Sequence, residues 1–444
     1  MDSAPVLGDR SPLVWLAALA LFALVFITHG ESRVTTANAD SRWSVFIAHS
    51  ILHEGNTDLN EFEPELQRQK DYCIHRINGK AYGLFPLAPA FIAVPFVALY
   101  EYSPTLASRI LPGMGSVREY IAKNREAPSV FRVRDRLERA AASFVVALTT
   151  VILFGMALEF VTLPWAIGIA ILFAFGTSAW SIASRSLWQH GPSMLMTSLS
   201  LYLTVLGARS PRATVCVGFP LAAAYVARPT NAVFVVALLI FHFMRNRALL
   251  GYILLPFSFI LGLFSLLSLN TYGTLVPPYY QPNRLTASDT FIEAVAGNLI
   301  SPARGLFVFS PVLILSIWGA FLLFRHTTYR LLPSLLIASF LGHLVAISLF
   351  PHWWGGHSYG PRLMSDTLPT LIFFLLPAIR FIGTGPNLLA RPKTYVLAVL
   401  TLLSFLIHHH GATQQSALRW DRSPVSVDQE PERVWDWGDP PFLR

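Results

Sequence analysis

Residues 12–29 read Pro-Leu-Val-Trp-Leu-Ala-Ala-Leu-Ala-Leu-Phe-Ala-Leu-Val-Phe-Ile-Thr-His. This run is apolar almost throughout and has about the length of a bilayer-spanning helix, which needs roughly 20 residues. Comparable runs recur to the end of the chain, so the sequence predicts an all-α, polytopic membrane bundle with about 11–12 spans. The candidate spans are residues 12–29, 83–101, 138–160, 163–184, 192–207, 213–227, 230–244, 248–269, 306–324, 331–350, 366–382 and 394–410.

The composition excludes an ordinary soluble protein. Of the 444 residues, 53% are hydrophobic and 13% are charged, whereas soluble domains carry about 25% charged residues. The formal net charge of +8 falls largely between the apolar runs, where basic residues set membrane topology and attract the headgroups of membrane lipids. The sequence contains no nucleic-acid motif, so we expect no nucleic-acid partner. The two cysteines, Cys73 and Cys216, do not suggest a disulfide framework and cannot build a metal cluster.

The first apolar run raises the question of cleavage. Ala37-Asn38-Ala39 resembles a signal-peptidase site. The apolar run is long for a signal core, however, and the site lies far beyond its end. We therefore expect a retained membrane anchor.

Basic residues in short loops predict which side of a membrane each loop occupies. The segment 102–137 is rich in arginine, so we expect it to be a cytoplasmic loop. Basic turns at Arg209, Arg245, Arg325 and Arg391 mark the same side. The outer side, that of the periplasm or cell exterior, then holds residues 30–82, 228–230, 270–305 and 351–365 and the tail. Residues 1–410 thus form one transmembrane domain, with 30–82 as its first outer loop and 411–444 as a polar C-terminal tail.

The crossing pattern within residues 138–207 stays open. Between two cytoplasmic segments, 102–137 and 208–212, the chain must cross the membrane an even number of times. Three apolar runs lie between them. One of these runs is then re-entrant or crosses only half of the bilayer.

The first outer loop contains Ala39-Asp40-Ser41-Arg42-Trp43. Behind it, the apolar residues Trp43, Phe46, Ile47 and Ile51 recur at helical spacing up to Gly55. This pattern predicts an amphipathic, juxtamembrane helix that lies along the membrane surface. Asp40 at its N-terminus is either a helix cap or a general base that deprotonates an acceptor.

Four other clusters fall in predicted outer segments. Arg185, Gln189 and His190 form a polar island around Trp188, and Arg228 precedes Pro229 at the start of a span. The other two clusters are residues 298–306, with Arg304 and with Tyr279 and Tyr280 upstream, and the dense aromatic stretch 352–362. An interfacial Arg more often snorkels, and an aromatic belt is the plainer alternative for Trp and Tyr. The density of His, Gly and Arg in residues 352–362 favours a binding site, where rings stack on sugars and Arg362 holds phosphate.

With these motifs in view, the chain resembles the GT-C superfamily of polyprenyl-phosphate-dependent glycosyltransferases. That superfamily includes protein O-mannosyltransferases, the aminoarabinose transferase of lipid A and RgtA/B/C/D-like bacterial enzymes. Asp40-Ser41-Arg42-Trp43 resembles its acidic-x-Arg-aromatic segment, and Phe85-Pro86-Leu87-Ala88-Pro89 resembles the start of its second span. The chain departs from the family in having Ala39 before Asp40, where many members have a second acid, and His190 where an acid is frequent. No cofactor is therefore assigned, and a requirement for a divalent metal stays open.

The resemblance implies an inverting glycosyltransferase of a bacterial inner (plasma) membrane, with its active site on the outer side and Asp40 as catalytic base. Its donor would be a polyprenyl-phosphate-linked sugar and its acceptor a glycan, lipid or protein. The residues expected to bind the donor and its lipid phosphate are Arg185, His190, Arg228, Arg304, Arg362, Tyr279 and Tyr280. Those expected to line the sugar and acceptor pocket are Arg42, Trp188, Gln189, His352, Trp353, Trp354, His357 and Tyr359.

The alternative function is a polytopic lipid or solute transporter, including a flippase. Buried Arg and His side chains on broken helices would suit it equally. Many transporters are built from internal repeats, and the sequence shows none.

Overall fold

The computed structural model describes residues 11–32, 34, 39–69, 72–282, 285, 289–326, 330–383 and 391–444. Residues 37 and 38 of the signal-peptidase-like motif lie outside these ranges, as do residues 33, 35–36 and 70–71 of the first loop. The all-α prediction is confirmed, because 75% of the structure is helical. The described strands form a single hairpin of β1 (Ile74–Ile77) and β2 (Lys80–Gly83), paired antiparallel with Ile74 opposite Gly83.

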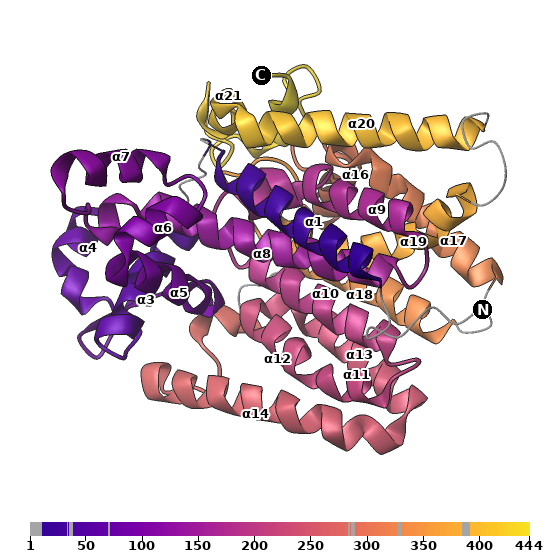
Figure 1. Cartoon of the computed structure of the whole chain (residues 1–444), viewed down its shortest axis with the longest axis horizontal. Coiled ribbons are helices and arrows are strands. Elements are labelled where there is room, and N and C mark those ends of the chain that lie inside the picture. Colours follow the sequence, from indigo (N-terminus) through magenta and orange to yellow (C-terminus); the bar gives the residue numbers. More distant parts are fainter. Residues whose placement is uncertain are drawn as a thin grey trace.

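Long helices packed side by side form the main body (Figure 1). Among the described residues, six helical segments are long and apolar enough to cross a membrane. They are α1 (Pro12–Gly30), α8 (Arg134–Ala157), α14 (Arg247–Tyr272), α18 (Leu331–Ser348), η9 with α19 (Arg362–Thr367 and Leu368–Gly383) and α20 (Pro392–Thr413). The shorter helices of the body are α9 (Leu163–Phe175), α10 (His190–Leu206), α11 (Pro211–Cys216), α12 (Gly218–Ala227), α13 (Ala232–Arg245) and α17 (Ile314–His326).

The outermost helices expose apolar side chains in a way that suits lipid. On α14, Leu255 is 73% exposed and Phe259 is 63% exposed, and α1 and α20 expose similar large side chains. In water such a continuous apolar surface would be costly, at roughly 25 cal/mol for each Å². The outer surface thus agrees with a helical membrane protein.

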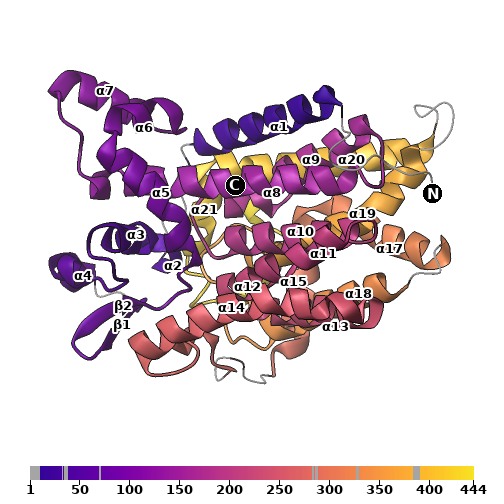
Figure 2. The same ribbon diagram turned by 60° about the horizontal axis from the view of Figure 1, so that its bottom comes forward.

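Residues 31–133 form a separate group of short helices, here called the α2–α7 module, at the end of the body where α1 finishes and α8 begins (Figures 1 and 2). Its helices are α2 (Ala39–Arg42), α3 (Ser44–His53), α4 (Glu63–Gln69), α5 (Ala88–Tyr102), α6 (Pro104–Ile110) and α7 (Gly115–Asn124). The remaining short helices are α15 (Phe291–Ile300), α16 (Leu306–Phe309) and α21 (Gln415–Arg419).

The expectation that residues 30–82 and residues 102–137 lie on opposite sides of the membrane is wrong. The backbone N–H of Gly113 donates to Glu31 Oε1 at 2.9 Å, and Arg139 Nε donates to the carbonyl of Gly30 at 3.1 Å. Segments joined by hydrogen bonds cannot lie on opposite sides of a hydrocarbon layer about 30 Å thick. The segments 30–82 and 102–137 therefore share one end of the body.

Helix α5 likewise differs from the span expected at residues 83–101. It packs along α3, and Glu101 in its last turn contacts His49 and His53 near the end of α3. α5 therefore belongs to the α2–α7 module and does not run to the far end of the body.

The new placement is consistent with three passes of the chain along the body within residues 138–207. Glu138, at the start of α8, accepts a hydrogen bond from the backbone N–H of Leu187, between α9 and α10. At the other end, Arg209 after α10 donates to Glu159 between α8 and α9, at 3.0 Å. The chain thus runs along the body three times between these two ends, through α8, through α9 and the residues that follow it up to Leu187, and through α10.

The helix expected behind Asp40 is present as α3, and Gly55, with φ of +65°, follows its end. Its setting differs from a membrane surface. Val45 and Ala48 pack against α5 and α8, and the ring of Phe46 stacks on Phe131 at 4.9 Å. Because α3 is covered on several sides, it is an internal helix of the α2–α7 module.

Candidate functional site

Asp40 and Arg362 meet at the end of the body that carries the α2–α7 module. Arg362 donates from a terminal guanidinium nitrogen to Asp40 Oδ2 at 2.7 Å, and the two side chains are 11% and 13% exposed. The guanidinium lies over the ring of Trp188, with its central carbon 4.7 Å from the ring centroid. An Arg in this position gains a cation–π attraction while it stays bound to the carboxylate. The fold thus joins the expected catalytic base, one expected phosphate ligand and one expected pocket residue.

Asp40 is not the cap of α3. It lies in the first turn of α2, and Trp43 occupies the N-cap position of α3. Its Oδ1 is 3.4 Å from the hydroxyl of Tyr72, which donates a long hydrogen bond. Burial and the nearby Asp40 carboxylate raise the pKa of Tyr72, so its hydroxyl stays protonated. Both carboxylate oxygens of Asp40 therefore accept hydrogen bonds from other segments of the chain, Oδ1 from Tyr72 and Oδ2 from Arg362.

Three buried polar atoms near this pair have no hydrogen-bond partner among the described residues. They are Nε of Arg362, Nε1 of Trp188 and Oε1 of Gln189. Buried donors and acceptors in proteins are nearly always satisfied, so unpaired ones require an explanation such as a ligand or ordered water. Gln189 uses its amide nitrogen to donate to Tyr279 at 2.7 Å, and the ring of Tyr279 packs on Phe85 at 5.3 Å. The surroundings of Asp40 thus offer two unpaired N–H donors and one unpaired acceptor.

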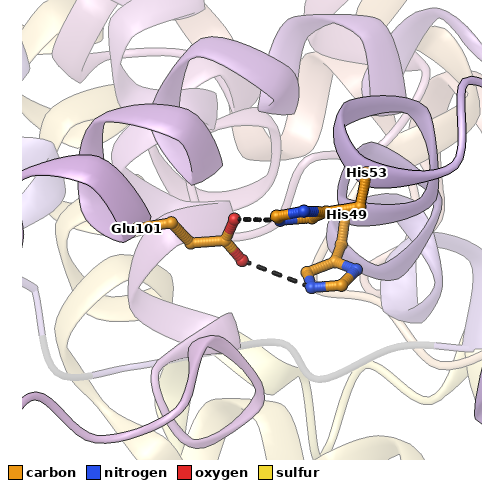
Figure 3. Close-up of side chains that lie close together, drawn as sticks. All are labelled: His49, His53 and Glu101. Atoms are coloured by element: carbon orange, nitrogen blue, oxygen red, sulfur yellow. Dashed lines mark hydrogen bonds and ion pairs between the residues drawn. The ribbon is translucent and has the colours of Figure 1, made fainter.

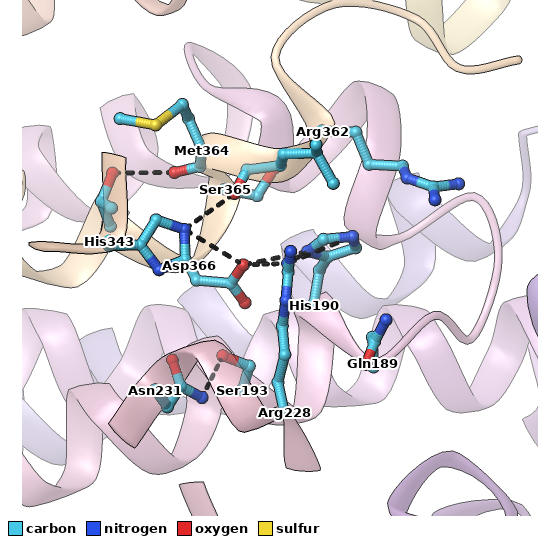
Figure 4. A network of polar contacts seen from close by, with 12 residues as sticks. Gln189, His190, Ser193, Arg228, Asn231, His343, Arg362, Met364, Ser365 and Asp366 are labelled. Atoms are coloured by element: carbon cyan, nitrogen blue, oxygen red, sulfur yellow. Dashed lines mark hydrogen bonds and ion pairs between the residues drawn. The ribbon is translucent and has the colours of Figure 1, made fainter. Parts of the chain in front are cut away.

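A second network lies deeper and contains a carboxylate that the sequence analysis missed. Asp366 accepts from Arg228 and is 3.1 Å from Nδ1 of His190, while His343 approaches to 4.0 Å from the other side (Figure 4). Asp366 and His190 are almost completely buried. Arg228 faces Asp366 and balances its buried charge, and His190 lies within hydrogen-bond distance of the same carboxylate. The sequence contained a signal for Asp366, because it is an acid at the start of the apolar run 366–382 and acids within membrane spans are rare.

The guanidinium of Arg304 forms hydrogen bonds with other groups of the protein. It donates to the carbonyls of Trp354, Ala303 and Gly356 and to Asp421 Oδ1, the last at 2.6 Å. The side chain is 2% exposed. Burial raises the pKa of Asp421 despite the opposing effect of Arg304. Arg304 thus ties the C-terminal tail to the loop 352–360, and its role as a phosphate ligand stays a prediction.

The aromatic stretch 352–362 packs mainly against protein. Trp353 and Tyr359 are 2% and 1% exposed, and Trp354 donates its indole N–H to Asp428 in the tail. The Tyr359 hydroxyl donates to the carbonyl of Ile407 at 2.6 Å. The ring faces expected to stack on a sugar are therefore covered. The glycines of this stretch allow its backbone conformation, because Gly355, Gly356 and Gly360 all have positive φ.

The remaining candidates have varied surroundings. Arg185 is buried and bonds to the carbonyl of His29, but one terminal nitrogen has no partner among the described residues. Tyr280 is buried and donates to the carbonyl of Val226. His352 is exposed, and its ring lies tilted against that of Trp354 with 5.2 Å between the centroids, while His357 contacts Ser426 of the tail. Arg42 is half-buried in the last turn of α2.

One group of side chains in the described part of the chain can hold a metal ion. The ligand atoms of His49, His53 and Glu101 all lie within 4.8 Å of one another (Figure 3). These residues belong to α3 and α5, and the sequence analysis did not name them as candidates. Asp40 is not part of the group.

Comparisons of the chain with protein-family models, with curated proteins and with solved structures find no match. The geometry of the site therefore carries the functional argument alone.

Proposed function

We propose that this chain is a glycosyltransferase of the GT-C type that takes a sugar from a polyprenyl-phosphate donor at the end of the bundle where Asp40 lies. The observation that carries the proposal is the pairing of Asp40 with Arg362 beside unpaired buried donors. A base and a phosphate-binding cation in contact are what this transfer needs. The site is also where the apolar body meets a polar module, so a lipid-borne donor and a water-borne acceptor can meet there.

The proposed reaction is a single displacement at the anomeric carbon. An acceptor hydroxyl or amine attacks that carbon, Asp40 takes its proton, and the bond from the carbon to the phosphate oxygen breaks. The lipid phosphate leaves with the bonding electrons, and the configuration at the anomeric carbon inverts. General-base catalysis of this kind contributes about 10²–10⁴-fold to the rate.

Arg362 has two roles in this scheme. In the resting protein it holds the Asp40 carboxylate at 2.7 Å. When donor binds, Arg362 turns to the phosphate and stabilises the charge that builds up there during transfer. The exchange of partners leaves Asp40 available to accept the proton. The ring of Trp188 lies against the guanidinium of Arg362. The unpaired indole N–H of Trp188 can also form a hydrogen bond with the bound sugar substrate.

The alternative, a lipid or solute transporter, is favoured by the buried Arg228–Asp366–His190 network. Buried charges of this kind mark ion and substrate pathways in many transporters. The transporter reading assigns no role to the carboxylate and arginine at the bundle end, whereas the proposed transfer uses both. For this reason the enzyme is the better-supported function.

The test uses proteoliposomes that contain the full chain and a panel of radiolabelled polyprenyl-phosphate sugars. A glycosyltransferase converts label from the lipid fraction into an acceptor-linked product, and polyprenyl phosphate appears in equal amount. Movement of intact labelled donor between leaflets, with no product for any acceptor class, would contradict the proposal and support the transporter.

A further inference from the structure

Two histidines of α3 point toward one carboxylate of α5 (Figure 3). His49 and His53 are four positions apart and therefore lie on the same face of the helix. Nε2 of His49 is 3.4 Å from Glu101 Oε1, and Nε2 of His53 is 2.6 Å from Glu101 Oε2. The two imidazole rings are 4.4 Å apart between centroids. Two nitrogen ligands and one oxygen ligand thus converge from two helices.

The spacing is close to that of a tetrahedral metal site. With metal–ligand distances of about 2.0–2.2 Å, neighbouring ligand atoms of a tetrahedron lie about 3.3–3.5 Å apart. The His49–Glu101 pair already has this separation, at 3.4 Å. The His53–Glu101 pair is closer, but the His53 side chain is 41% exposed, so it is free to move by the small amount required.

The charges around the group favour a dication. Besides Glu101, the carboxylates of Glu54 and Glu61 lie close enough to act on His49 electrostatically, and their negative charge attracts a dication.

We propose that His49, His53 and Glu101 form a binding site for a divalent transition-metal ion, with Zn²⁺ as the best-fitting ion. Two imidazole nitrogens and one carboxylate oxygen are a recurrent zinc donor set, whereas Mg²⁺ and Ca²⁺ prefer oxygen ligands alone. All three side chains are partly exposed, which leaves a fourth position for water or an added ligand. The ion would clamp α3 onto α5.

The test measures metal binding directly on the purified, tag-free full chain in nanodiscs. The apo protein is titrated with Co²⁺, whose visible absorption reports four-coordinate geometry, and with Zn²⁺ against a chromophoric chelator. The variants are His53→Gln and Glu101→Gln, which alter exposed ends of the site, and His53→Cys, which replaces one metal ligand by another. The control is His75→Gln, a half-buried histidine of β1 in the same module.

The proposal predicts one tight equivalent of Zn²⁺ in the parent and in His75→Gln. Loss of a direct ligand should weaken binding by more than the roughly 10–100-fold that loss of an outer-shell partner costs, and His53→Cys should restore it. Equal affinities for the parent, His53→Gln and Glu101→Gln would overturn the site. The result is separate from the proposed transfer reaction, because Asp40→Asn should bind the metal as the parent does.

Discussion

Arg362 is the side chain that connects the predicted base to the rest of the molecule. It bonds to Asp40 across 322 positions of the sequence and lies over Trp188. All three residues stood among the candidates predicted from the sequence, each from its own local motif. Their meeting was not predictable, because one sequence does not say which loops of a bundle come together.

Other residue roles depended on partners that the sequence hides. Arg304 looked like a free cation before a span, yet its acceptors are backbone carbonyls and Asp421, 117 positions away. Trp353 and Tyr359 looked like an exposed pocket, but the tail and neighbouring helices cover them. Local sequence pattern therefore did not predict the surroundings of these residues.

Replacing Arg362 by Gln should weaken binding of a polyprenyl-phosphate sugar by about 10–100-fold, because a hydrogen bond to a charged group contributes about 1.5–3 kcal/mol. Equilibrium binding of labelled donor to the protein in nanodiscs measures the effect. Arg76→Gln is the matched control, since Arg76 pairs with Glu63 at an exposed position of the α2–α7 module. Equal donor affinity in the two variants would contradict the role given to Arg362.

At the scale of helices, the apolar runs form helices as predicted. Six described helical segments, against about 11–12 expected spans, are long and apolar enough to cross a membrane, and one segment was misplaced. The arginines of 102–137 were counted as if they lay in a short loop, but they belong to the segment 31–133 between α1 and α8. Charge biases topology mainly through loops shorter than about 60 residues. The same error led to the prediction that α5 spans the membrane and that one run within residues 138–207 is re-entrant.

The corrected arrangement predicts which sites share a side of the membrane. In a background without Cys73 and Cys216, single cysteines at Gln67 and Glu119, both exposed, should react with a membrane-impermeant maleimide from the same side. A cysteine at Arg212, beyond α10, should react only from the other side. Labelling of Glu119→Cys together with Arg212→Cys, and apart from Gln67→Cys, would restore the cytoplasmic assignment of 102–137.

Close contact between α17 and α19 depends on a glycine. A Cβ atom added to Gly319 would lie 1.8 Å from the carbonyl oxygen of Phe374, so the helices would have to separate. Gly319→Val should therefore lower stability by about 1–3 kcal/mol, the usual cost of overpacking. Thermal unfolding in detergent measures it. Gly262→Val on α14 has nothing within 4 Å and should unfold like the parent, and an equal loss in both would refute the packing argument.

At the scale of the whole molecule, polar features gather at one end of an apolar body. The α2–α7 module, the loop with Trp188 and Gln189, the start of η9 and the tail all meet there. Hydropathy predicted the helical body, and the motifs lie in several of the loops that meet at this end, where their chemical role stays a prediction. The way the tail seals this end was not predictable, because its few apolar residues form no core without the loops they cover.

Arg304 and Asp421 hold the tail in this position. Arg304→Ala should detach it, because breaking a buried ion pair costs about 3–5 kcal/mol. Limited proteolysis should then cleave near Trp420, which is 1% exposed in the intact protein. Arg209→Ala removes a partly exposed pair with Glu159 at the other end and should leave the tail protected. Tail cleavage at the same rate in both variants, or in neither, would contradict the anchoring role.

The central claim is that Asp40 is the base of a sugar-transfer reaction. The most direct measurement compares the transfer rate of the parent with that of Asp40→Asn in proteoliposomes with saturating donor. Asp135→Asn, an exposed acid at the start of α8, is the control. We expect Asp40→Asn to lose at least about 100-fold in rate while it binds donor at least as well, since Arg362 loses only its protein partner. Transfer by Asp40→Asn at the rate of the parent would contradict the claim.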